Sequence, residues 1–126
     1  MENSTMQRGP EQWFLDAHPE RGSVRVQVST GRGLFPVEGA RVEIYRRLGP
    51  EPTVFYEGVT DASGIAEDIR LPALPVGWSQ SAETAGISGT VYQVSVRHPQ
   101  HGTVEGRPVT VFPRIETVLA VSLCAV

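Results

Sequence analysis

The sequence contains no lysine, and this gap limits the kinds of partner the protein can have. All eleven basic residues are arginines, the chain of 126 residues carries a net charge of -3, and no basic run is longer than Arg46-Arg47. Proteins bind nucleic acid through concentrated positive surfaces that neutralise phosphates. Nucleic acid is therefore not an expected partner.

Cysteine and long apolar runs are also scarce. The single Cys124 cannot form an internal disulfide, and its apolar surroundings predict a small buried hydrophobe. No apolar stretch approaches the roughly 20 residues that span a bilayer, and residues 1–20 lack the apolar core of a signal peptide. We expect a protein without a Sec-type signal, made in the cytoplasm and not membrane-spanning.

What the sequence does contain favours β-strands. Valine (17 residues) outnumbers leucine (7) and isoleucine (5), and β-branched side chains fit a pleated sheet better than a helix. Thirteen glycines and ten prolines interrupt the chain at the spacing typical of a sandwich or barrel. The length suits one domain with its own core.

Period-two alternation locates the strands from Ser23 onward. Val24, Val26 and Val28 alternate with polar residues, as in a half-buried strand. Asp61-Ala62-Ser63-Gly64 predicts a tight hairpin, because Asp can cap the turn and Gly can adopt a positive φ. Seven strands are predicted, beginning at Ser23 and then over 40–47, 53–60, 65–71, 91–98, 103–112 and 116–123.

Two segments lie outside this pattern. Residues 1–22 read as a polar arm with one apolar knot, Trp13, Phe14 and Leu15, which must pack either on its own domain or on a neighbouring copy. Residues 72–90 form a long loop rich in Pro, Ser, Gly and Ala that includes Trp78. Loops of this length are often functional.

Several motifs resemble those of the carboxypeptidase-regulatory-like domain, a prealbumin (transthyretin-like) sandwich. They are the Val-x-Val-x-Val strand, Pro36-Val37-Glu38-Gly39-Ala40, Thr60-Asp61-Ala62-Ser63-Gly64 and Tyr92-x-Val94-x-Val96. The whole pattern is similar to small stand-alone proteins of spore-forming Firmicutes. The resemblance implies an all-β, seven-stranded antiparallel Greek-key sandwich over residues 23–126, preceded by the arm at 1–22.

The resemblance to this fold also raises two chemistries that the sequence disfavours. Hydroxyisourate hydrolases share the fold but end in Tyr-Arg-Gly-Ser, whereas this chain ends in Ser122-Leu123-Cys124-Ala125-Val126. Pilin domains of a neighbouring family cross-link Lys to Asn, which a chain without lysine cannot do. No nucleophile elbow or phosphate loop is present either, so we expect no catalytic residues.

Two clusters of side chains are candidate metal sites. His98 and His101 have an i, i+3 spacing that could place two imidazoles on a metal, but a surface turn explains them as well. The carboxylates of Glu57, Asp61 and Asp68 could collect around Ca²⁺, although turn capping accounts for Asp61. No metal or cofactor is expected.

These observations predict a non-enzymatic structural protein of a bacterial cell or spore surface. It is expected to form a homo-oligomer or filament through its N-terminal arm and sheet edges, with Trp13, Phe14 and Leu15 as contact residues. The alternative is a module that binds an envelope glycan or a protein partner through the 72–90 loop, with Trp78 as a stacking platform.

Overall fold

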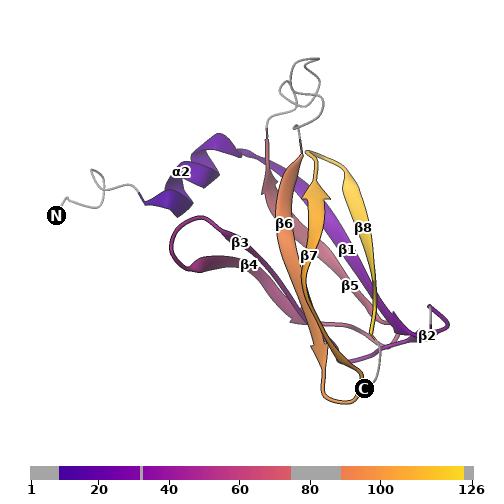
Figure 1. The fold of residues 1–126 in the computed structure, drawn as a ribbon. Helices are drawn as coiled ribbons and strands as arrows, with labels where there is room; N and C mark the ends of the chain where they lie inside the picture. The colour runs from indigo at the N-terminus through magenta and orange to yellow at the C-terminus, as the bar shows by residue number, and fades with distance from the viewer. Residues whose placement is uncertain (1–8, 32, 75–88, 124–126) are drawn as a thin grey trace.

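The protein folds as two β-sheets packed face to face, with one helix at an end of the sandwich (Figure 1). The computed structural model describes residues 9–31, 33–74 and 89–123. The predicted all-β sandwich is confirmed. It contains eight strands rather than seven, because the loop after β1 adds the two-residue strand β2 (Phe35–Pro36).

Sheet A is centred on β1 (Glu20–Thr30). Strand β5 (Ile65–Ala73) pairs antiparallel with β1 on one side, and β2 pairs with the end of β1. Strand β8 (Glu116–Ser122) pairs with β1 in parallel, so the predicted fully antiparallel arrangement is wrong at this one pair. Strand direction depends on where the chain re-enters the sheet, which the alternation of side chains does not reveal.

Sheet B has the order β4-β3-β6-β7, and all its neighbours are antiparallel. Its strands are β3 (Arg41–Arg47), β4 (Pro52–Val59), β6 (Thr90–His98) and β7 (Gly102–Val111). One extra residue in β4, around Phe55, shifts the register against β3. A bulge of this kind puts Phe55 and Tyr56, both half-buried, against the core.

The core lies between the two sheets and is built mainly from valine. The predicted inward residues of β1 and β3 are buried, among them Val24, Val26, Val42 and Ile44. Arg41 lies on the exposed outer face of β3, as the alternation predicts. Period-two burial is thus confirmed on both sheets.

The turn at Asp61–Gly64 forms as predicted but does not make a hairpin within one sheet. Asp61 Oδ1 accepts hydrogen bonds from the backbone N–H groups of Ser63 (2.9 Å) and Ile65 (3.0 Å), and Gly64 has φ +76°. The strands that it joins, β4 and β5, belong to different sheets. A turn sequence fixes the reversal of the chain, but tertiary packing decides which sheet receives the next strand.

Thr60 fixes the start of this crossover to the loop before β3. Its buried hydroxyl donates to the Val37 carbonyl (2.6 Å) and accepts from the Ala40 N–H (2.9 Å). Gly39, between these residues, has φ +78°, which supplies the backbone freedom expected of it. The motif Pro36–Ala40 therefore has a structural explanation.

The predicted arm contains regular structure. Helix α2 (Pro10–Ala17) begins with proline at its first position, and β1 starts at Glu20, three residues before the expected boundary. Arg21 lies across from Pro72 and Gly22 from Leu71 in β5, so residues 20–22 belong to the sandwich. No helix in the described part of the chain is long and apolar enough to cross a membrane.

Candidate interaction surfaces

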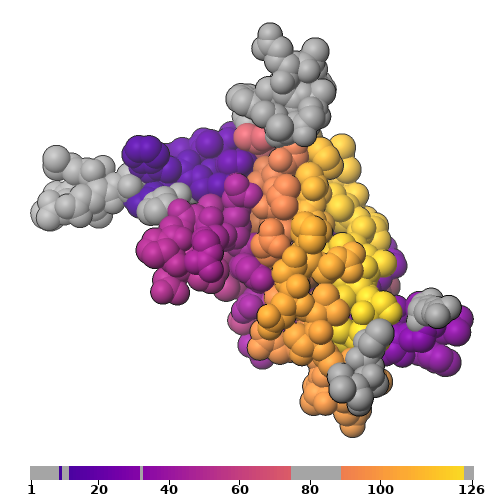
Figure 2. Space-filling view, viewed as in Figure 1, coloured from indigo at the N-terminus to yellow at the C-terminus, as the bar shows by residue number. Residues whose placement is uncertain are grey.

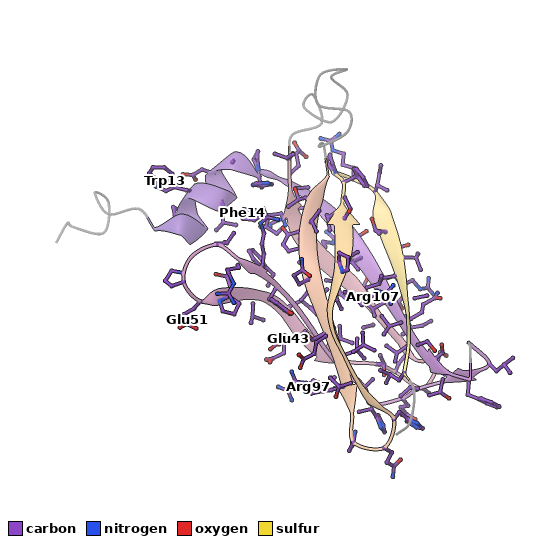
Figure 3. The ribbon with its side chains drawn as sticks, viewed as in Figure 1. Trp13, Phe14, Glu43, Glu51, Arg97 and Arg107 are labelled. Carbon is purple, nitrogen blue, oxygen red and sulfur yellow. The ribbon has the colours of Figure 1, made fainter. Side chains whose placement is uncertain are left out.

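Helix α2 docks on the sandwich through Phe14, which is only 8% exposed. The Phe14 ring meets Phe55 of β4 (centroids 5.6 Å apart) and Tyr92 of β6 (6.2 Å), both edge to face. Phe55 and Tyr92 also contact each other at 5.2 Å. Phe14, labelled in Figure 3, thus joins α2 to strands β4 and β6 of sheet B.

Arg46 and His18 complete the docking site around the Phe14 ring. The guanidinium carbon of Arg46 lies 5.1 Å from the ring centroid, a cation–π contact, and Arg46 Nη1 donates to the carbonyl of Val91. His18 stacks on Phe14 at 4.0 Å, and its Nδ1 donates to the Phe14 carbonyl (2.7 Å). Burial lowers the pKa of His18, and Arg46 lowers it further, against the opposing effect of the Phe14 hydrogen bond.

The three contact residues predicted in the arm therefore differ in burial. Phe14 is buried and Leu15 is half-buried against the core, whereas Trp13 is 66% exposed on the outer side of α2 (Figure 3). Phe14 is buried because the helix turns it onto Phe55 and Tyr92. Of the two dockings left open by the sequence, the structure has the one on the same chain.

The sequence did not identify the residues that receive the arm. Arg46, Phe55 and Tyr92 come from three strands and meet only in the folded sheet. Two half-buried aromatics in succession, Phe55 and Tyr56, broke the alternation of β4 and were the one available signal. Trp78, the other predicted contact residue, lies outside the described residues.

Sheet edges were the second predicted means of association, and three of the four long edge strands are modified against pairing. Strands β4, β5 and β7 each contain a proline and a register shift against their neighbour. Prolines and bulges are devices by which natural sheets prevent edge-to-edge pairing. The prolines are Pro52 in β4, Pro72 in β5 and Pro108 in β7.

Strand β8 is the exception. It pairs with β1 in unbroken register from Glu116 to Ser122, and it contains neither proline nor glycine. In the described strands its opposite edge has no ladder partner. Two side chains link it to β7: Thr117 Oγ1 donates to the Thr110 carbonyl (2.9 Å), and Arg107 Nη2 donates to the Ala120 carbonyl at 3.4 Å. The latter bond is long and exposed, so it covers the edge weakly.

The two candidate metal clusters differ from what a metal site requires. The His98 and His101 rings lie 4.8 Å apart, but His98 Nδ1 accepts a hydrogen bond from the Gln100 N–H within the turn. Glu57 pairs with Arg41 (3.2 Å) on sheet B, and Asp68 lies on sheet A. Within residues 9–31, 33–74 and 89–123, no three His, Cys, Asp or Glu side chains are grouped to hold a metal.

Comparisons with known proteins identify the fold. No family model and no curated protein matches the chain. Among solved structures, it is similar to the TIE protein of Bacillus anthracis (TM-score 0.56, 17% identity), covering 85% of this chain and 17% of that one. It is also similar to 3-chlorocatechol 1,2-dioxygenase of Rhodococcus opacus (0.55, 14%), covering 85% and 61%.

A third similar structure is the minor pilin GBS52 of Streptococcus agalactiae (TM-score 0.51, 16% identity), covering 85% of this chain and 45% of the pilin. The chain thus spans less than two thirds of each of these proteins. At such identities the similarity shows the fold alone. It confirms the broader part of the resemblance, a prealbumin-like sandwich.

Proposed function

We propose that this protein is a non-enzymatic structural module that self-associates through the open edge of β8. The observation that supports this most strongly is the contrast between β8 and the other edge strands. Strands β4, β5 and β7 each contain proline and a bulge, whereas β8 has an unbroken register and neither feature. An unmodified edge strand is a template for pairing with another strand.

A second copy of the chain fits this edge when the two β8 strands run antiparallel about a two-fold axis at Leu119. Val118 then lies beside Ala120 of the second copy, and Glu116 lies beside Ser122, so no like charges oppose each other. Val118 is 53% exposed and would be covered. The pairing replaces the long Arg107–Ala120 bond with a backbone ladder.

Trp13 offers a second contact. A residue this large and apolar, held outward on a helix whose Phe14 and Leu15 pack against the sandwich, is a common anchor in protein interfaces. A symmetric β8 contact closes into a dimer, whereas an additional contact through Trp13 could join dimers into longer assemblies. In this proposal the arm contributes Trp13, and Phe14 and Leu15 keep the helix in place.

The location of such a module at a bacterial cell or spore surface is the finer part of the proposal. It is supported by the motifs shared with carboxypeptidase-regulatory-like domains and with small proteins of spore-forming Firmicutes. The presence of the same fold in a minor pilin is compatible with a structural function, at the level of the fold alone. An antibody against the chain should label intact cells or spores of the source organism.

Light scattering over a range of concentrations tests the self-association. Val118→Lys adds a charge to the open edge of β8. Val59→Lys is the matched control, since Val59 is 61% exposed on β4, an edge strand that contains a proline and a bulge. We expect the wild type and Val59→Lys to associate and Val118→Lys to remain monomeric. A monomeric wild type at high concentration would reject self-association and leave the glycan- or protein-binding alternative. Equal association of both variants would reject the β8 edge.

A further inference from the structure

Two residues of the described chain other than glycine have a positive φ, and both lie at one hollow. They are Asp68 (φ +63°) and Arg114 (φ +62°). Six other positive-φ positions are occupied by glycine, which adopts this conformation without steric cost. Among the described residues, positive φ thus occurs at glycine, except at the two charged residues that line this hollow.

Both residues occupy backbone positions at which glycine is expected. Asp68 lies in the bulge of β5, and the equivalent bulge of β7 has Gly106 with φ +71°. Arg114 follows Pro113 in the turn closed by the bond from the Ile115 N–H to the Phe112 carbonyl, a position that usually favours glycine. Non-glycine residues held in such conformations are concentrated at functional sites.

The hollow has a volume of about 310 Å³ and lies on the outer face of sheet A, over Ser23. Ser23 is small and lies between Arg70 of β5 and Glu116 of β8, its partners across the sheet. Gly22 contributes only backbone to the hollow, since its place in the alternation faces inward, where a Cβ would collide with the Phe112 carbonyl. Long charged side chains therefore surround a floor of small residues.

Charges of both signs around the hollow are left unpaired. Arg114 pairs with Glu20, with Nε 3.5 Å from Oε1. Within the described part of the chain, the side chains of Arg21, Arg70, Asp68 and Glu116 have neither a hydrogen bond nor an ion pair. A ligand that has both a negative and a positive group would form ion pairs with both kinds of unpaired side chain.

We propose that this hollow binds a small zwitterion of about dipeptide size, with a carboxylate on Arg21 and Arg70 and an ammonium toward Glu116, which lies on the other side of β1 from Arg70. Guanidinium groups bind carboxylates through paired, charge-assisted hydrogen bonds. Strands β5 and β8 flank β1, so the charges are spread over about two strand spacings, roughly 10 Å, which suits a dipeptide better than a single amino acid. The Ser23 hydroxyl lies on the floor as a further donor.

Titration with glycylglycine, followed by amide chemical shifts of the full chain, tests this site. We expect saturable shifts at Gly22, Ser23, Asp68, Arg70 and Glu116. N-acetylglycylglycine and glycylglycinamide, which each lack one charge, should bind at least tenfold more weakly. Absence of saturable shifts would overturn the proposal. Equal binding of inorganic phosphate would overturn it as well, since the hollow would then be a plain oxyanion site.

Variants separate a ligand site from a charged surface. Arg70→Gln should abolish binding, and Arg97→Gln, exposed on β6 of the other sheet, should leave it unchanged. Asp68→Gly and Arg114→Gly should keep or raise the Tm while weakening binding at least tenfold. Wild-type affinity in both glycine variants would show that the strained residues do not serve a ligand. Titration at protein concentrations at which light scattering shows a monomer makes the result independent of self-association.

Discussion

The rings of Phe14 and His18 stack with their centroids 4.0 Å apart, and His18 Nδ1 donates a hydrogen bond to the carbonyl of Phe14. The residue that anchors the arm is thus coupled to a group that can gain a charge near neutral pH. Arg46, which also contacts the Phe14 ring, opposes that charge. Protonation of His18 should therefore weaken the docking of α2.

The first prediction concerns pH. Burial lowers the pKa of His18 below its ordinary value of 6.5, so the unfolded chain binds a proton more readily than the folded one. The free energy of unfolding should be highest above pH 6.5 and fall as the pH drops from 6.5 through the lowered pKa. Urea unfolding at pH 7.5, 6.5 and 5.5 measures this fall.

His18→Gln is the control, because it cannot gain a charge. The difference in unfolding free energy between pH 7.5 and 5.5 should be smaller in this variant than in the wild type. An equal difference would mean that other groups cause the pH dependence and that His18 is not buried in solution.

The second prediction compares two neighbouring aromatics of the helix. Phe14→Ala should lower the free energy of unfolding by about 3 kcal/mol, because it removes a buried ring from Phe55 and Tyr92. Trp13→Ala should change it by less than about 0.5 kcal/mol, since Trp13 is exposed. Equilibrium unfolding measures both, and amide exchange over residues 10–17 reports the docking directly. Similar losses in the two variants would contradict docking of the arm on its own chain.

The strands were predictable from the sequence because their signal is local. Alternation of Val24, Val26 and Val28 follows from one buried and one exposed face, and it needs no knowledge of the partner strand. The same holds for the turn at Asp61, whose carboxylate caps two N–H groups within four residues. Neither signal says which strand lies alongside, so the parallel pairing of β1 with β8 could not be predicted.

The interaction surfaces depend on contacts between distant parts of the chain, and the sequence showed only fragments of them. An eight-residue helix is too short to be stable alone, so α2 is stabilised by the packing of Phe14 on Phe55 and Tyr92. The positive φ of Arg114 could not be predicted from its residue type, and that of Asp68 only weakly, because Asp tolerates this conformation but does not require it. The hollow that they line could not be predicted either, because its residues come from β1, β5 and the turn before β8, which are far apart in the sequence.

The last prediction concerns Gly64, which the sequence assigned to the turn between β4 and β5. Gly64 has φ +76°, its carbonyl accepts a hydrogen bond from the Val28 N–H (2.7 Å), and a Cβ there would collide with the Val28 carbonyl. Gly39 has nearly the same φ, +78°, but a Cβ would meet nothing within 4 Å. Gly39→Ala should therefore lower the free energy of unfolding by about 1 kcal/mol, from backbone strain alone. Gly64→Ala should lower it by about 3 kcal/mol or more, because β1 must also move away from the turn. Urea unfolding of the two variants gives the comparison, and equal losses would show that the close approach of Val28 to the turn does not matter for stability.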